Sequence, residues 1–296
     1  MRFAYVDVFA PRPLTGNPVV VVHGAEPEKD ATLQALAREF NQSETAFVLP
    51  GGGTADWRLR SFTPSGAEVF GAGHNALGAA VWLAASGLLP DGAFGSDRRQ
   101  YTQTIGDDRF AVTVSEVTPG GAHVAIRQSA PRMLGRVDDR AGLASALGVR
   151  PADVLLERVP EVISTGAQHL LVPLRDRHSV DAARPDATLL TALLAGAGAE
   201  GCAVFSLDPA EAGAHAHVRF FNPAMGIQED PATGTAAGPL AVKLLRDGLV
   251  PPTPTVVVVQ GHAVGRPSRI AVDVDGDDVT LHGDGIVVAE GTLVGI

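Results

Sequence analysis

An acidic residue stands beside the predicted start of a helix near residue 230. Asp230 precedes Pro231, and the small residues of the run 232–238 lead from there into an apolar stretch. Gly234 and Thr235 would leave backbone N–H groups uncovered in the first turn, where the helix dipole adds partial positive charge, so a bound carboxylate would fit there without Lys or Arg. A carboxyl group beside such an anion site indicates proton transfer on an acid substrate. Because Asp before Pro is also common in turns, a turn role for Asp230 stays open.

A second small-residue turn opens a helix far upstream. Gly73 and His74 lead into the apolar run 76–85, much as Gly234 and Thr235 lead into the later helix. This shared plan predicts two similar halves whose helix N-termini face one cleft. His74 could supply an imidazole for proton transfer, although a capping or packing role fits its position as well.

A third candidate is Glu44, which lies between a predicted helix end and a largely apolar strand. If this carboxyl group is buried, its pKa rises, which would suit it to proton transfer near neutral pH. A surface turn residue is the alternative for this position.

Composition limits the class of partner. The chain has 296 residues, of which 45% are hydrophobic and 19% charged, so it is long enough to bury a core as two domains or one large domain. A formal net charge of −10 argues against nucleic acid as a partner, because phosphate binding needs clustered Lys and Arg. An anionic substrate would therefore have to be held locally, by helix N-termini.

The cellular compartment can be predicted from the single cysteine and from the lack of signal-peptide and membrane-spanning segments in the sequence. Cys202 is the only cysteine and lies in the apolar run 201–206, which is typical of a buried small hydrophobe and excludes an intrachain disulfide. The N-terminus lacks the long apolar stretch of a signal peptide, and no window approaches the roughly 18 apolar residues of a membrane helix. We therefore expect a cytoplasmic protein without a membrane partner.

The sequence gives no support for a nucleotide site, a serine nucleophile or a metal site. The run 196–201 matches a dinucleotide fingerprint by letter, but a predicted helix precedes it and a strand follows it, which is typical of a glycine turn at a helix end. No nucleophile elbow and no phosphate-binding P-loop occurs. His215 and His217 would share one strand face, yet nothing nearby completes a metal site, so a solvated strand face is favoured. We expect no metal and no cofactor.

The predicted elements alternate irregularly and favour an α+β fold. Strands crowd together near the C-terminus, which disfavours a doubly wound parallel sheet. Helices are predicted at 30–40, 74–85, 141–147, 187–194 and 234–245. Strands are predicted at 3–9, 19–22, 45–49, 57–62, 110–114, 123–127, 203–207, 217–221, 255–260, 268–274, 279–282 and 286–289.

Two lobes account for this order. The Pro and Gly residues of 118–121 mark a candidate boundary, although a hairpin loop would look similar. It divides an N-terminal lobe, 1–118, which the last C-terminal strand could complete, from a C-terminal lobe, 122–296. The helices at 74–85 and 235–245 are apolar nearly all round, so each is expected to thread a curved sheet.

Several stretches of the chain carry a resemblance when they are taken together. They include Ser-Glu-Thr at 43–45, Gly-His at 73–74 and Asp-Pro-Ala-Thr-Gly at 230–234, and further matches lie at 6–9, 16–18, 41–42, 60–64, 260–261 and 265–268. The chain resembles the PhzF family of phenazine-biosynthesis-type isomerases, whose fold is that of diaminopimelate epimerase. The resemblance implies two lobes, each a barrel-like sheet around a central helix, assembled as a homodimer.

The resemblance also implies roles for the candidate residues. Glu44 would be the proton-shuttling acid/base, and His74 and Asp230 would assist it. Gly73 and Thr235 would line the substrate pocket, and Asn75 and Gly234 beside them are further candidate substrate-binding residues. The family often has Ser at position 235, and Thr keeps the hydroxyl.

The epimerase relatives use two cysteines, one on each lobe, to remove a proton from one face and return it on the other. Here Ala72 and Asp230 stand at the corresponding places, and Cys202 lies outside both motifs, so a two-thiol racemase is disfavoured. Asn75 and the segment 65–70 depart from the commonest family pattern beside the pocket, which leaves the substrate open.

The sequence therefore predicts a cofactor-free isomerase that moves a proton between carbons of a small carboxylate-bearing substrate, with an allylic or enol system. Two alternatives stay open. One is an epimerase or racemase that exchanges a proton at one stereocentre, and the other is a non-catalytic protein that binds a small acid.

Overall fold

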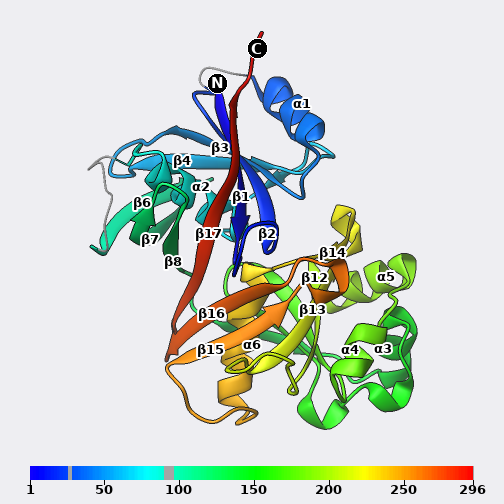
Figure 1. Cartoon of the computed structure of the whole chain (residues 1–296). Helices are drawn as coiled ribbons and strands as arrows, with labels where there is room; N and C mark the ends of the chain where they lie inside the picture. The colour runs from blue at the N-terminus through cyan, green and yellow to red at the C-terminus, as the bar shows by residue number, and fades with distance from the viewer. Residues whose placement is uncertain (26–28, 90–96, 296) are drawn as a thin grey trace. The chain divides into compact units, whose positions relative to one another are not determined.

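The computed structural model describes residues 1–25, 29–89 and 97–295. The chain forms two compact units, of which unit 1 comprises 1–127 and 282–296 and unit 2 comprises 128–281 (Figure 1). The stretch 118–121, for which the sequence left a boundary or a hairpin loop open, is the turn of a hairpin in which Thr118 pairs with Gly121. The chain passes from unit 1 to unit 2 between Arg127 and Gln128, and it returns to unit 1 between Leu281 and His282.

The described strands of unit 1, with β17 entering it from unit 2, close into an eight-stranded barrel. Each strand pairs with the next, and the last pairs with the first; the pairs β2–β3 and β4–β6 are parallel. In barrel order the strands are β1 (Arg2–Val8), β2 (Asn17–His23), β3 (Thr45–Pro50), β4 (Trp57–Phe62), β6 (Arg99–Ile105), β7 (Asp108–Thr118), β8 (Gly121–Arg127) and β17 (Asp278–Thr292), with β5 (Glu68–Val69) beside β4.

Helix α2 (His74–Ala85) packs against this barrel on several sides, with contacts to β1, β2, β3, β7 and β8. All of its residues are buried, as its apolar sequence predicts. A Cβ atom at Gly78 would lie 2.3 Å from Cγ1 of Val19, so glycine is what allows the helix to approach β2 so closely. The sequence predicted both α2 and the outer helix α1 (Asp30–Phe40) with their observed bounds.

Strand β17 corrects one prediction. Two separate strands were expected at 279–282 and 286–289, but the structure has one strand over Asp278–Thr292. Gly283 and Gly285 lie in the gap between the two predicted strands. A Cβ atom at either glycine would lie 2.4 Å from a side-chain atom, of Phe9 and of Val81 respectively, so these glycines serve close packing within a continuous strand.

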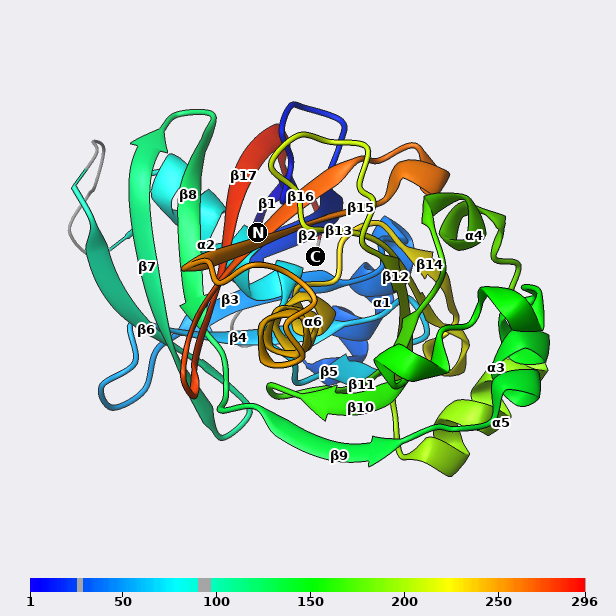
Figure 2. The ribbon, with the colours of Figure 1, turned by 90° about the horizontal axis from the view of Figure 1, so that it is seen from below.

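The strands of unit 2 belong to the same continuous sheet and surround helix α6 (Gly234–Arg246). Figure 2 shows α6 nearly end-on, with β15 and β16 on one side and β10 and β11 on the other, and α6 contacts all four strands. In sheet order the strands are β9 (Arg132–Arg136), β10 (Glu161–Ser164), β11 (Gln168–Pro173), β12 (Gly201–Ser206), β13 (Ala216–Asn222), β15 (Thr255–Gln260) and β16 (Ser268–Asp275), with β14 (Ile227–Asp230) also on β13.

The remaining helices cover the outside of the unit 2 sheet. Helices α3 (Arg140–Leu147) and α5 (Ala187–Ala197) share an apolar cluster with β11, β12 and β13. Gly198 ends α5 with φ of +68°, so the run 196–201 is a helix C-terminal turn, as expected. The other helical segments are α4 (Arg177–Ala182) and single 3₁₀ turns at Pro151–Asp153, Leu156–Arg158, Pro223–Met225 and His262–Val264.

The observed fold is therefore α+β, as predicted. Among the described residues, no helix is both long enough and apolar enough to span a membrane.

Candidate active site

His74 lies in the first turn of α2 and is 6% exposed. Its Nε2 atom is 3.3 Å from the hydroxyl oxygen of Ser43. Burial lowers the pKa of His74 to about 4, so its imidazole is neutral near pH 7. A neutral imidazole has one donor and one acceptor nitrogen, and it can therefore relay a proton without changing the charge of its surroundings.

Glu44 follows Ser43 directly and precedes β3. It is half-buried, and its Oε2 atom is fully buried. The contact between Ser43 and His74 joins positions that are 31 residues apart in sequence. It brings the segment that carries Glu44 to the start of α2 within unit 1.

Asn75 is buried, and its amide is engaged in the turn that begins α2. Its Oδ1 accepts hydrogen bonds from the N–H groups of Gly73, at 2.9 Å, and Ala76, at 2.8 Å. Its Nδ2 donates to Ser61 Oγ at 3.0 Å and to the carbonyl oxygen of Gly71 at 3.1 Å. This pattern favours a role in shaping the turn over the direct substrate contact expected from the sequence.

In unit 2, Asp230 ends β14 and is 6% exposed. The hydroxyl of Thr233, the N-cap residue of α6, donates to Asp230 Oδ2 at 2.5 Å. Gln260 Nε2 donates to the Asp230 carbonyl oxygen at 2.7 Å and to Thr233 Oγ1 at 3.1 Å, and Gln260 Oε1 accepts from Thr233 N–H at 3.3 Å. The carboxylate is thus held at the N-terminus of α6 by groups that the sequence motif alone did not identify.

Gly234 and Thr235 form the first turn of α6. The carbonyl oxygen of Gly234 accepts a hydrogen bond from Gln128 Nε2 at 3.1 Å. Thr235 Oγ1 is 3.0 Å from Nε2 of His169, which comes from β11. Sequence reasoning missed His169 because β11 itself was not predicted.

Behind Asp230, a buried ion pair fixes β13 to β14. Arg219 is 5% exposed, and its Nε and Nη2 donate to the two carboxylate oxygens of Glu229 at 3.0 Å and 2.6 Å. Its Nη1 donates to the carbonyl oxygens of Val180, Asp181 and Ala183 at 3.0, 3.1 and 2.8 Å. Arg219 therefore ties the end of α4 to the strand that carries Asp230.

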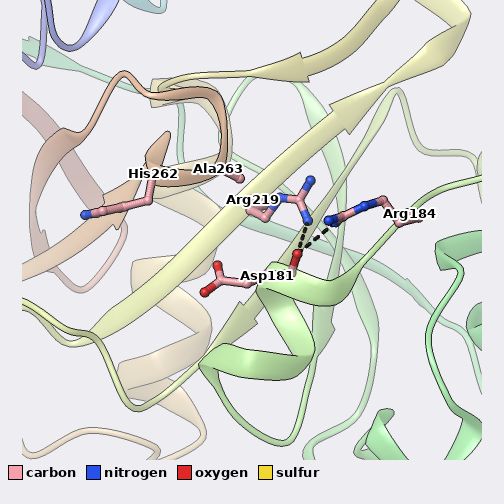
Figure 3. Close-up of a pocket in the computed structure, with 5 residues that line it drawn as sticks. All are labelled: Asp181, Arg184, Arg219, His262 and Ala263. Atoms are coloured by element: carbon pink, nitrogen blue, oxygen red, sulfur yellow. Dashed lines mark hydrogen bonds between the residues drawn. The ribbon is translucent and has the colours of Figure 1, made fainter.

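The same arginine lines a pocket of about 320 Å³ in unit 2, together with Asp181, Arg184, His262 and Ala263 (Figure 3). Figure 3 shows Arg184 and Arg219 both directed to the backbone oxygen of Asp181. Because Glu229 neutralises Arg219, the most buried cation of the pocket is already occupied by the protein. None of the site residues predicted from the sequence lines this pocket.

The family model for phenazine biosynthesis-like proteins, PhzC-PhzF, matches residues 6–291. The chain belongs to this family. The trans-2,3-dihydro-3-hydroxyanthranilate isomerase of Pseudomonas aeruginosa is 34% identical to it over 296 residues, which cover 98% of each protein. The predicted family resemblance is confirmed, and the protein is an isomerase of the PhzF type.

Solved structures agree with the predicted fold. A predicted epimerase from Pseudomonas aeruginosa is similar with a TM-score of 0.84 and 31% identity, covering 100% of this chain and 99% of its own. A hydroxyproline epimerase from Agrobacterium vitis is similar with a TM-score of 0.68 and 14% identity, covering 99% of this chain and 90% of its own. The second similarity shows the fold alone, and it confirms the epimerase-like architecture.

Thiol chemistry does not fit the single cysteine of this PhzF-family isomerase. Cys202 lies in β12 and is fully buried, and burial raises the pKa of its thiol to about 12. It is therefore a protonated, packed side chain near neutral pH, as the sequence predicted.

The two histidines considered as metal ligands have other partners. His215 Nδ1 accepts from Val257 N–H at 3.0 Å, and His217 Nε2 is 2.8 Å from Asp181 Oδ1. His217 is 2% exposed, so the solvated strand face expected for it is wrong. In the part of the chain that the structure describes, no group of three or more His, Cys, Asp or Glu residues is arranged to hold a metal ion.

The buried imidazole of His74 predicts how stability depends on pH. Its pKa falls from the ordinary 6.5 to about 4 on folding, so between these values the unfolded chain binds a proton that the folded protein does not. The free energy of unfolding should therefore decrease as the pH falls through this window. His74→Gln is expected to weaken this pH dependence by about one proton, measured from urea midpoints at pH 7 and pH 5. An unchanged dependence would contradict a neutral, buried His74.

Proposed function

We propose that this isomerase moves a proton between two carbons of a small carboxylate-bearing substrate. In this proposal Glu44 is the acid/base, and His74 and Asp230 assist it. The Glu44 carboxylate removes a proton from a carbon next to a double bond, and the double bond shifts by one position. The Glu44 carboxyl group then returns a proton to the carbon at the other end of the former double bond. The reaction changes no oxidation state, because one C–H bond breaks and another forms.

The contact of 3.3 Å between Ser43 Oγ and His74 Nε2 is the observation that carries this proposal. It brings the Glu44 segment to an imidazole that burial keeps neutral, with its pKa lowered to about 4. We infer that the half-buried carboxyl group of Glu44, on the residue next to this contact, exchanges protons with the substrate while the imidazole adds no fixed charge. Gly73, the N-cap residue of α2, directly precedes His74 and carries no side chain.

The start of α6 supports the substrate class. Gly234 and Thr235 occupy its first turn, where N–H groups are uncovered and the helix dipole favours an anion. The Asp230 carboxylate is bonded to the N-cap residue Thr233, and the first turn itself contains no Asp or Glu. We assign Gly234 and Thr235 to the binding of the substrate carboxylate, and Asn75 to the support of the α2 turn.

The test uses trans-2,3-dihydro-3-hydroxyanthranilate, the compound for which the Pseudomonas relative is named. We expect the purified protein to convert it to a double-bond isomer, detected by NMR, without added metal or nucleotide. Recovery of the compound as its epimer would instead support proton exchange at one stereocentre. Saturable binding without any chemical change would support a non-catalytic acid-binding protein.

A homodimer forms part of the same proposal, on the strength of the family resemblance. Sedimentation equilibrium would test it, and a mass of one chain at assay concentration would contradict it.

A further inference from the structure

His169 is a buried side chain of unit 2 that contacts Thr235, one of the two proposed carboxylate-binding residues. It lies in β11, is 3% exposed, and its Nε2 is 3.0 Å from Thr235 Oγ1. Its other ring nitrogen, Nδ1, is buried and has no hydrogen-bond partner among the described residues. Nε2 therefore has Thr235 as its hydrogen-bond partner, and Nδ1 has no polar partner among the described residues.

The orientation of the ring is fixed by packing. The ring of Phe220 meets it edge to face, with centroids 5.0 Å apart and planes at 87°. Gly201 pairs with His169 across β11 and β12, and a Cβ atom on Gly201 would lie 2.3 Å from the tip of Phe220. The absence of a side chain at Gly201 thus makes room for the aromatic ring that holds His169 in place.

These contacts determine which nitrogen carries the proton. Burial lowers the pKa of His169 to about 4, so the ring is neutral and has a single N–H group near pH 7. A proton on Nδ1 would leave a buried N–H group without an acceptor, which is rare and costly in folded proteins. A proton on Nε2 is used in a hydrogen bond to Thr235 Oγ1, so the Nε2–H tautomer is favoured.

This tautomer has a consequence for Thr235. When Nε2–H donates to Thr235 Oγ1, the hydroxyl acts as acceptor toward His169, and its own proton is left to donate elsewhere. We propose that His169 is a positioning residue that makes the Thr235 hydroxyl a hydrogen-bond donor to the substrate carboxylate. This inference rests on the proposed function, since it assigns Thr235 to carboxylate binding.

A hydroxyl–imidazole pair also stands at the start of α2. There the imidazole of His74 is on the helix and the hydroxyl of Ser43 is on the segment just before β3, at 3.3 Å. At α6 the hydroxyl of Thr235 is on the helix and the imidazole of His169 is on a strand. The imidazole is therefore on the helix in unit 1, and the hydroxyl is on the helix in unit 2. This difference fits different roles, in which unit 1 transfers a proton and unit 2 donates a hydrogen bond to an anion.

The first test measures the tautomer directly. In protein labelled with ¹⁵N-histidine, two-bond ¹H–¹⁵N spectra should show His169 as a neutral ring protonated at Nε2, unchanged between pH 6 and pH 8. The spectrum of the His169→Gln variant lacks the signal of His169, and this loss identifies the signal in the wild-type spectrum. A ring protonated at Nδ1, or one that titrates in this range, would overturn the inference.

The second test measures carboxylate binding through kinetics with trans-2,3-dihydro-3-hydroxyanthranilate. His169→Phe should raise KM roughly tenfold, the loss of one hydrogen bond to a charged group, and change kcat by no more than about twofold. His169→Gln, whose amide N–H can reach the same oxygen, should recover most of the loss. Melting temperatures show that the compared variants are folded.

The matched control removes the acceptor. In a Thr235→Val background, His169→Phe should have little further effect on KM, because no hydroxyl remains to be oriented. An equal effect with and without the hydroxyl, or a fall in kcat at constant KM, would overturn the positioning role. If the wild-type protein does not turn over this compound, the proposed function fails, whereas the ¹⁵N measurement still decides the tautomer of His169.

Discussion

Glu44→Gln is expected to lower kcat by about 10²- to 10⁴-fold, the usual contribution of a positioned acid/base. The amide has nearly the shape of the carboxylic acid, but it cannot take up and return a proton at neutral pH. KM should change much less, because the proposed carboxylate-binding residues belong to α6 and not to the Glu44 segment. Steady-state assays of both proteins with the same substrate check this.

Glu39→Gln supplies the matched control for this substitution. Glu39 lies on the exposed face of α1 in the same unit. Because substitutions at exposed positions usually have small effects, Glu39→Gln is expected to leave kcat within about twofold of the wild-type value. If Glu44→Gln also retains wild-type kcat, Glu44 is not the acid/base.

Arg219→Met is expected to destabilise the folded protein by about 3–5 kcal/mol, the effect of removing one partner of a buried ion pair. The substitution leaves the Glu229 carboxylate, with a side chain only 12% exposed, without its bidentate partner. It also removes the donor to the carbonyl oxygens of Val180, Asp181 and Ala183. Chemical denaturation followed by circular dichroism measures the free energy of unfolding.

Two further variants separate the buried pair from a general effect of losing an arginine. Arg269→Met removes a half-exposed pair with Glu211, at 3.7 Å, and should cost at most about 1 kcal/mol. Arg219→Met combined with Glu229→Met should be more stable than Arg219→Met alone, because no unpaired buried charge remains. A double variant that is less stable than the single one would contradict this explanation.

The sequence pattern was sufficient to predict those helices and strands whose structure depends on residues close together in the chain. The amphipathic face of α1, with Leu33, Leu36 and Ala37 buried, and the left-handed Asn41 at its end are both readable from the sequence. The apolar sequence of α2 likewise required a buried helix. Strands β4 and β15 were predicted with their observed bounds because turn residues flank short β-branched or aromatic runs.

Elements that depend on their neighbours were missed. β6 carries Gln100, Thr102 and Thr104 among its residues, and its strand character comes from long pairings with β7 and β4. β10 and β11 are short and pair with each other in a hairpin, and their other sheet neighbours, β9 and β12, lie far away in sequence. β17 was divided at glycines whose reason is the close approach of Phe9 and α2, which no local pattern reveals.

The candidate site follows the same division. The motif residues Glu44, His74 and Asp230 could be selected from residue type and family resemblance. Their partners could not, because Ser43 with His74 and Gln260 with Asp230 are contacts between distant segments. The engagement of the Asn75 amide in the α2 turn was hidden for the same reason.

The role of Glu44 is tested most directly by isomerisation in D₂O, with product deuterium followed by NMR and mass spectrometry. The wild-type protein should place solvent deuterium at the carbon that receives the proton. Glu44→Gln should lose deuterium incorporation and product formation together, while it still binds the substrate. Deuterium incorporation by Glu44→Gln at the wild-type rate would contradict the assignment of Glu44 as the acid/base.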